Sequence, residues 1–428
     1  MLLRGATVLT CNASMDVVVA DVRVRDGFIV EVGALPPHPG ESVEDLTGHY
    51  LLPGFVQTHI HLVQTLFRGL ADDLLLLDWL RTRIWPLEGA HTAESTYASA
   101  RLGCTELLLG GTTSILDMAS VRHTDSVFQA ARESGMRVWA GRAMMDRENE
   151  AGLSQPTEQS LRGACDEADR WHGQGRLKYA FAPRFVPSCT DELLRQAAVE
   201  ARTRGCLVHT HASENEDEVA LVRQMTGRDN VEHLHSLGLS GPDVLLAHCI
   251  HLTPVEVQLL AKTGTRVLHC PSSNLKLGSG LAHVPELLEA GVHVSLGADG
   301  APCNNRLDAF TEMRLAALLQ KPRLGPTAMP APTALALATR HGAEALGLNA
   351  GVVEAGRHAD LIALDPGLFA GGDPMSTVVY SLSPSSVRHV WVGGEALVHD
   401  GRLTGWDRTE TLALCSTELA GCVDRAGL

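Results

Sequence analysis

No cluster of lysines and arginines occurs in this sequence, and acidic residues outnumber basic ones. The chain has 50 Asp and Glu against 35 Lys and Arg, a formal net charge of −15. A negatively charged surface repels a phosphate backbone, so we expect no nucleic-acid partner. The ten cysteines form no C-x-x-C pair. We therefore interpret them as buried free thiols and not as a metal or redox motif.

Long hydrophobic runs are also missing. No stretch reaches the roughly 18 uninterrupted apolar residues that a transmembrane helix needs. The first ten residues, MLLRGATVLT, lack a basic region followed by an apolar core. We expect no membrane partner and a soluble, cytoplasmic protein. The composition, 45% hydrophobic and 20% charged, is typical of a globular protein.

Short apolar runs that end in a polar residue alternate with helical periodicity after residue 50. This alternation is typical of parallel βαβ units. The helical segments include Asp191–Arg202 and Pro254–Ala261. Eight strands of this kind predict a (β/α)8 barrel, and the candidates are Leu52–His59, Thr112–Asp117, Arg137–Arg142, Tyr179–Arg184, Cys206–His211, Val244–His248, Arg266–His269 and Val292–Asp299.

The two ends of the chain differ from the middle. Residues 1–52 and 353–428 are rich in short strands and glycine turns, as in Val22–Val32 and Val387–Gly394. We expect both ends to pair in a small β-sandwich, with the barrel, residues 53–352, inserted between them. A long segment between the first two barrel strands, residues 62–111, is expected to cover the catalytic face.

Histidines and one aspartate stand at the carboxyl ends of several predicted strands. His59 and His61, at i and i+2, point to the same side of the first strand and suit two bonds to one metal ion. By itself this pair is equally compatible with packing. The other candidates are His211 and Glu214 on the fifth strand, His248 on the sixth and Asp299 on the eighth.

These positions all lie where a barrel enzyme builds its site. Three neutral imidazoles and a carboxylate favour one ion, Zn²⁺ first and Fe²⁺ second. The fourth strand ends in Arg184, whereas a lysine there could supply a carbamate bridge, so a second metal is not expected. His209 is interpreted as a packing residue, and His251 has already left its strand.

Five segments give the chain a clear resemblance to the amidohydrolase superfamily, within the mononuclear chlorohydrolase and aminohydrolase branch. They are Pro53–His61, His211–Glu214, Ala247–Cys249, Pro271–Lys276 and Gly297–Ala301. The resemblance implies that His59, His61, His211 and Asp299 bind the metal ion. It further implies that Asp299 accepts a proton from the attacking water, His248 orients that water, and Glu214 passes the proton to a ring nitrogen. The implied reaction is hydrolytic deamination of a cyclic amidine.

The segment after the first strand resembles deaminases of S-adenosylhomocysteine, methylthioadenosine or 5′-deoxyadenosine. In those enzymes the glutamate corresponding to Glu88 contacts the ribose, and the region of Trp85 packs beside the nucleoside. Helix packing is an equally good explanation for Trp79 and Trp85. Arg142 matches one of two arginines that hold the homocysteine carboxylate, and no residue in Ser154–Glu158 replaces the second, which favours a neutral substrate.

Other functions stay open. Arg184 and Phe185 resemble residues that contact the purine in guanine deaminases, so guanine is an alternative substrate. A triazine-type hydrolase that displaces chloride or an alkylamine would use the same ligands. A non-enzymatic scaffold is disfavoured because every expected ligand is present. We expect a small-molecule substrate and a homo-oligomer.

Overall fold

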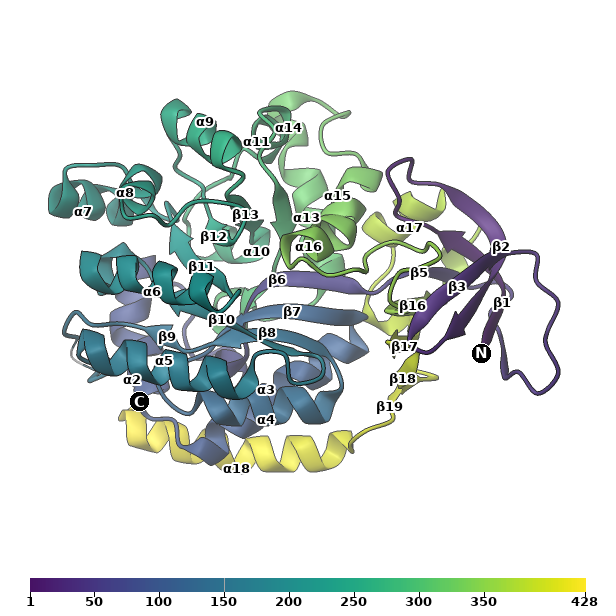
Figure 1. Cartoon of the computed structure of the whole chain (residues 1–428), viewed down its shortest axis with the longest axis horizontal. Coiled ribbons are helices and arrows are strands. Elements are labelled where there is room, and N and C mark those ends of the chain that lie inside the picture. Colours follow the sequence, from purple (N-terminus) through teal and green to yellow (C-terminus); the bar gives the residue numbers. More distant parts are fainter. Residues whose placement is uncertain (150) are drawn as a thin grey trace.

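The chain forms a parallel barrel and, at one side of it, a mixed sheet built from both termini. The computed structural model describes residues 1–149 and 151–428. Figure 1 shows β6 (Phe55–His61), β7 (Thr112–Met118) and β8 (Arg137–Gly141) side by side in the centre of the molecule, with helices outside them. The terminal strands lie at the right of that view. The predicted (β/α)8 barrel is confirmed.

All eight predicted barrel strands are present. The first begins three residues later than expected, because Leu52 belongs to the terminal sheet. The strands after β8 are β10 (Leu177–Pro183), β11 (Leu207–Ala212), β12 (Val244–His248), β13 (Arg266–His269) and β14 (Val294–Leu296). A two-residue strand, β9 (Ala143–Met144), continues the line of β8 along β10.

The eighth strand is split, and the split closes the barrel. Its first part, β14, pairs with β13, and its second part, β15 (Asp299–Gly300), pairs with β6. Gly297 lies between the two parts. A Cβ there would stand 2.7 Å from the backbone nitrogen of His59, so only glycine permits this approach. The register sets Asp299 opposite Ile60, between the two histidines of β6.

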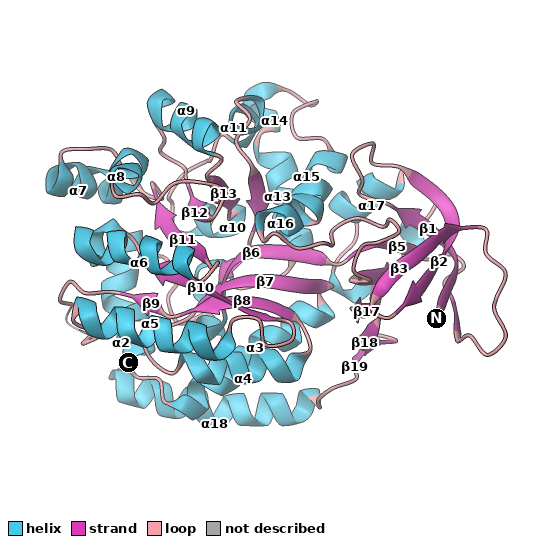
Figure 2. Ribbon diagram, in the orientation of Figure 1, coloured by secondary structure: helices cyan, strands magenta, loops and turns pink. Residues whose placement is uncertain are grey.

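Helices follow the barrel strands and cover the outside of the barrel (Figure 2). Their ends carry ordinary helix signals: Thr253 and Glu256 form a capping box at the start of α9 (Pro254–Thr263), and Gly264 ends this helix in the left-handed conformation. The helices are α4 (Thr124–Ser134), α5 (Thr157–Trp171), α6 (Asp191–Thr203), α7 (Glu216–Thr226), α8 (Asn230–Ser236), α9 (Pro254–Thr263), α10 (Pro271–Lys276), α11 (Val284–Glu289), α12 (Ala301–Asn304), α13 (Ala309–Leu319), α14 (Lys321–Leu324), α15 (Ala331–Ala338) and α16 (Arg340–Ala345).

The long connection from β6 to β7 is helical. It holds a buried 3₁₀ helix, η1 (Leu62–Phe67), and the 17-residue helix α3 (Ala93–Leu109). Between them α1 (Leu76–Trp79), the π-helical turn η2 (Leu80–Ile84) and α2 (Trp85–Gly89) follow one another without a break. A π turn inside a helix is often found at functional sites.

Strands from both ends of the chain form one hydrogen-bonded sheet. Antiparallel pairing of β5 with β16 joins the two ends, and Gly54 alone separates β5 from the first barrel strand. Leu3, Ile29, Leu361 and Trp391 are buried together in its core. The strands are β1 (Leu2–Leu9), β2 (Val17–Arg25), β3 (Phe28–Gly33), β4 (Val43–Asp45), β5 (Tyr50–Pro53), β16 (Leu361–Leu364), β17 (Val387–Val392), β18 (Glu395–His399) and β19 (Arg402–Leu403).

The C-terminal residues differ from the expectation of short strands alone. Residues 353–428 also contain α17 (Pro374–Tyr380) and a 19-residue helix, α18 (Arg408–Ala426). Figure 1 shows α18 lying along the barrel beneath α3 and α4. Cys415 and Cys422, seven residues apart on one face of α18, are buried against Leu87 and Ala98 of the barrel. Among the described residues, no helix is both long and apolar enough to cross a membrane.

Candidate active site

His61 and His211 face each other across the mouth of the barrel. Their Nε2 atoms are 3.3 Å apart. The Nδ1 atoms contact backbone carbonyl oxygens, Met118 for His61 at 2.8 Å and Arg184 for His211 at 2.7 Å. A carbonyl only accepts, so each Nδ1 carries the proton and each Nε2 presents a lone pair to the other ring. Two lone pairs that face each other are suited to a shared cation.

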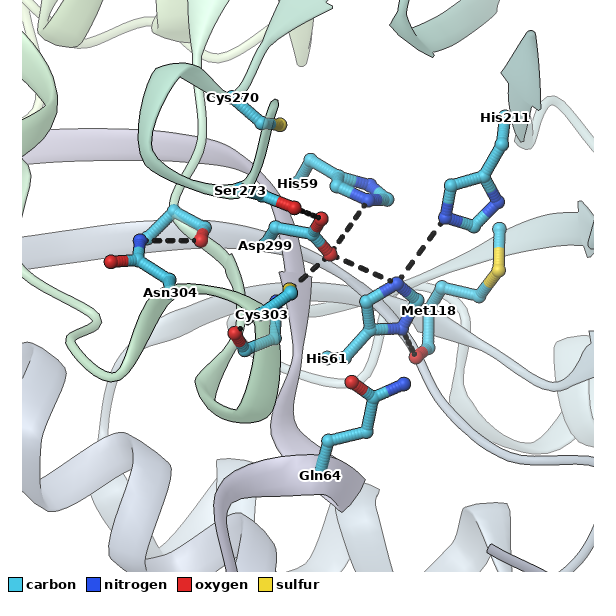
Figure 3. A network of polar contacts seen from close by, with 12 residues as sticks. His59, His61, Gln64, Met118, His211, Cys270, Ser273, Asp299, Cys303 and Asn304 are labelled. Atoms are coloured by element: carbon cyan, nitrogen blue, oxygen red, sulfur yellow. Dashed lines mark hydrogen bonds and ion pairs between the residues drawn. The ribbon is translucent and has the colours of Figure 1, made fainter. Parts of the chain in front are cut away.

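His59 and Asp299 complete this group (Figure 3). One carboxylate oxygen of Asp299, Oδ1, lies 3.3 Å from the Nε2 atoms of both His59 and His61. Its second oxygen, Oδ2, accepts a hydrogen bond from Ser273 at 2.6 Å. Asp299 has φ 63°, in the left-handed region, and such strain in a non-glycine residue is concentrated at functional sites.

The donor atoms fit a metal ion. His59, His61 and His211 can each offer one atom within 4.8 Å of the others, and so can His59, His248 and Asp299. The Nε2 atom of His59 is buried and has no hydrogen-bond partner within the described chain. Burial lowers the pKa of His61 to about 4 and lowers the pKa of His59 and of His211, so the three rings are neutral. Neutral imidazoles and a carboxylate are the usual ligands of a catalytic zinc ion.

Asp299 is ionised in this site. Burial alone would raise the pKa of Asp299, but the contact with His59 and the charge of His248, whose own pKa is raised, hold it well below its usual range. The carboxylate is therefore available both to a cation and as a proton acceptor.

Glu214 and His248 lie next to this group and are both buried. Glu214 Oε2 is 3.5 Å from His248 Nε2, which is 3.8 Å from Asp299 Oδ2. The opposite ring nitrogen of His248, Nδ1, lies 2.8 Å from the side-chain oxygen of Asn274. That contact makes Nδ1 a donor and directs Nε2 into the site. Burial raises the pKa of Glu214 to about 7, a value suited to proton transfer near neutral pH.

A pocket opens onto these groups. The insertion contributes an apolar wall of Leu76, Trp79 and Leu80, and Arg184 with Phe185 forms the side at the end of β10. The complete lining is His61, Gln64, Leu76, Trp79, Leu80, Arg184, Phe185, His211, Glu214, His248, Leu277 and Asp299. The insertion therefore covers the site, as expected from the sequence.

Arg184, which lines the pocket, forms a buried ion pair with Glu88, which does not line it. Arg184 donates to both carboxylate oxygens of Glu88, at 2.7 and 3.1 Å, and Gln64 donates to one of them at 2.8 Å. Burial opposes ionisation of Glu88, but the guanidinium of Arg184 keeps its pKa below the usual value. Both oxygens of Glu88 thus have partners already, and a substrate hydroxyl would have to share them.

A match to known proteins covers most of the chain. The profile of the amidohydrolase family matches residues 50–397. The chain belongs to the amidohydrolase family. It is 41% identical over 389 residues to a 5′-deoxyadenosine deaminase of Methanothermobacter thermautotrophicus, which covers 89% of this chain and 90% of the relative. It is 40% identical over 365 residues to a 5-methylthioadenosine/S-adenosylhomocysteine deaminase of Syntrophobacter fumaroxidans, covering 84% and 82%.

The chain is also similar to a protein of known structure. The crystal structure of an adenosine deaminase from Xanthomonas campestris with bound zinc is 30% identical and has a TM-score of 0.93. The alignment covers 100% of this chain and 98% of that one. The predicted resemblance to amidohydrolases is confirmed.

Two residues expected at the substrate of this amidohydrolase lie elsewhere. Arg142 follows β8, but its guanidinium pairs with Glu167 on α5 and Gln155, and it does not line the pocket. Trp85 does not line the pocket and packs between apolar side chains of the insertion and those at the ends of β7, β9 and β10. Both residues were expected at the substrate from the family resemblance, which does not specify their side-chain partners in this chain. Trp79, for which helix packing was an equally good explanation, lines the pocket.

Other residues were missed or left without a role. His209 Nε2 lies 2.7 Å from His59 Nδ1, so it supports the ring of His59 from behind. The i, i+2 spacing of His209 and His211 could have indicated this. Gln64 was missed, and no sequence signal marks it. The ring of His251 contacts the carbonyl of Ser279 at 2.6 Å, at the rim and outside the group of candidate ligands.

Proposed function

We propose that this protein is a metal-dependent hydrolytic deaminase of a 5′-deoxyadenosine-like purine nucleoside. The reaction replaces the 6-amino group by a 6-oxo group and releases ammonia. The observation that carries the proposal is the buried arrangement of Glu214, His248 and Asp299, beside the three histidines and within one pocket. The similarity to purine nucleoside deaminases over most of the chain supports it.

His59, His61, His211 and Asp299 are the proposed ligands of one divalent ion, Zn²⁺ in first place and Fe²⁺ in second. Such an ion supplies Lewis-acid activation of the attacking water. The zinc bound by the adenosine deaminase from Xanthomonas campestris supports this choice.

Asp299, His248 and Glu214 have separate roles in the proposed proton transfers. Ionised Asp299 accepts a proton from the attacking water at Oδ2, where Ser273 holds the carboxylate in place. His248 orients that water through Nε2, because Asn274 engages its other nitrogen. Glu214 donates a proton from Oε2 to the ring nitrogen next to the amino-bearing carbon. The amino group then takes the proton held by Asp299 and leaves as ammonia, while the hydroxyl proton returns to Glu214 and the 6-oxo group forms.

The pocket favours a neutral nucleoside. The guanidinium of Arg142 is hydrogen-bonded to Glu167 and Gln155, so it is not available to bind a homocysteine carboxylate through two N–H groups. The apolar wall of Leu76, Trp79 and Leu80 suits a purine or a deoxy or methylthio group. Guanine is the second candidate, because Arg184 and Phe185 both line the pocket.

The test is a substrate panel with the zinc-loaded protein: 5′-deoxyadenosine, methylthioadenosine, S-adenosylhomocysteine, guanine and a chlorotriazine. Ammonia and chloride are followed together. We expect ammonia from 5′-deoxyadenosine and methylthioadenosine at a higher kcat/KM than from S-adenosylhomocysteine, and no chloride. Ammonia from guanine alone, or chloride from the triazine without nucleoside turnover, would refute the nucleoside assignment.

A further inference from the structure

Three potential ligands meet in the terminal sheet, outside the barrel. Glu44 on β4, His389 on β17 and His399 at the end of β18 can each offer one donor atom within 4.8 Å of the other two. We propose that they form a second metal site, which binds Zn²⁺ or a similar divalent transition ion and links the two ends of the chain.

The hairpin of β17 and β18 sets the two histidines opposite each other. Val390 pairs with Val398 in the antiparallel register, so the next residues outward, His389 and His399, face one another. Their ring centroids are 4.7 Å apart. Directly after His399 the chain turns through Asp400 and Gly401, both left-handed, which fixes where the strand ends.

Glu44 reaches this histidine pair from the other end of the chain. It lies on β4, which pairs with β1, and its Oε2 is 3.5 Å from His399 Nε2. A bound ion would therefore join residues 43–45 to the hairpin of residues 387–399. This is the arrangement of a structural ion that joins segments distant in sequence.

His389 is buried and has a ring nitrogen that could bind a metal ion. It is only 6% exposed, and its Nδ1 has no hydrogen-bond partner in the part of the chain that the structure describes. Its ring stacks on Trp391 at 5.3 Å with 16° between the planes, which holds its orientation. An unpartnered buried imidazole is costly unless a ligand completes it.

The other two ligands are free to adjust. The side chains of His399 and Glu44 are 53% and 33% exposed, so they can rotate toward His389 and shorten the spacing to that of a tetrahedral ion. Water can occupy the fourth position.

The test measures zinc in three proteins: the unaltered chain, His399→Gln and His293→Gln. His399 is exposed, so its replacement does not endanger folding. His293 is the matched control, since it forms a comparable surface pair with Glu344 at 3.3 Å and also has a histidine, His341, beside it. Each protein is equilibrated with micromolar Zn²⁺ buffered by a chelator, and bound zinc and Tm are determined.

We expect His399→Gln to hold one equivalent of zinc fewer than the unaltered chain, and His293→Gln to hold the same amount. Zinc should raise Tm further in the unaltered chain and in His293→Gln than in His399→Gln, because the ion binds the folded state. Equal zinc content and equal Tm shifts in all three would overturn the proposal. The difference between variants reports on the sheet alone, so it does not depend on the deaminase assignment or on barrel occupancy.

Discussion

Glu214 is buried, and its Oε2 atom lies 3.5 Å from Nε2 of His248. Burial raises the pKa of Glu214 to about 7. Glu214→Gln keeps the size of the side chain but cannot move a proton. We expect kcat to fall by about 10²- to 10⁴-fold. Metal content should not change, because Glu214 is not among the proposed ligands. The measurements are steady-state ammonia release and zinc analysis of the same sample.

The control is Glu216→Gln, two residues further along and exposed at the start of α7. It should keep full activity. A Glu214→Gln enzyme with near-normal turnover would remove Glu214 from the mechanism. Loss of zinc in that variant would instead make it a ligand.

Glu88 and Arg184 are both buried, with side-chain exposures of 0% and 4%. Glu88→Gln leaves the guanidinium charged and without a counter-ion in a site of low dielectric constant. We expect the free energy of unfolding to fall by about 3–5 kcal/mol. The double variant Glu88→Gln/Arg184→Met should lose less, because no buried charge is left unpaired. Denaturant unfolding of the zinc-loaded proteins measures both.

If Glu88→Gln unfolds at the same denaturant concentration as the unaltered chain, the pair contributes no stability. Its role would then be confined to the substrate, and KM would be the quantity that changes. A double variant less stable than the single one would show that the charge on Arg184 is satisfied elsewhere.

The candidate ligands could be predicted because they depend on position along a strand. A histidine or aspartate at the carboxyl end of a barrel strand reaches the mouth whatever its neighbours are, and His59, His61, His211, His248 and Asp299 lie there together. For Arg142, position along the strand did not predict where the side chain lies. This residue also follows a strand, yet Glu167 draws its side chain away from the pocket. Side-chain partners such as Glu167 for Arg142, or His209 for His59, depend on packing that sequence position does not specify.

At the scale of elements, the eighth strand positions the site by dividing in two. A continuous strand was expected over Val292–Asp299, whereas β14 ends at Leu296 and β15 begins at Asp299. The interruption lets one strand pair with β13 and then with β6, and it carries Asp299 to His59 and His61. A periodicity of two cannot reveal such a break, because the apolar pattern runs through it unchanged.

Gly297→Ala tests this closure. The added Cβ would lie 2.6 Å from the backbone oxygen and 2.7 Å from the backbone nitrogen of His59. β6 and the eighth strand must then separate, which costs about 1–3 kcal/mol and moves His59 away from Asp299. We expect a lower Tm together with reduced zinc content and activity.

Gly372→Ala serves as the control, since its Cβ would meet only the hydroxyl of Thr377, at 3.9 Å. That variant should match the unaltered chain in all three measurements. Full zinc content in Gly297→Ala would mean that the closure is loose and does not position the ligands.

At the scale of the whole molecule, the barrel and the terminal sheet are joined by an ion pair between sequence-distant residues. Arg137, at the start of β8, donates to both carboxylate oxygens of Asp360, at 2.6 and 3.1 Å. Asp360 also accepts a hydrogen bond from the backbone of Gly393, between β17 and β18, at 2.7 Å. The general pairing of the chain ends was predictable from their strand patterns, but α18 and this ion pair were not, because each depends on which barrel surface the C-terminal segment meets.

Asp360→Asn should weaken this junction without touching the chemistry. The amide can still accept from Gly393, but Arg137, whose side chain is 12% exposed, loses its counter-ion. We expect the free energy of unfolding to fall by about 3 kcal/mol. The pair lies at the amino end of β8, whereas the candidate ligands lie at the carboxyl ends of their strands, so kcat and zinc content should stay unchanged. Exposed Asp365→Asn is the control and should alter none of these quantities. A fall in kcat that matches the loss of stability would instead show that the terminal sheet sets the geometry of the barrel mouth.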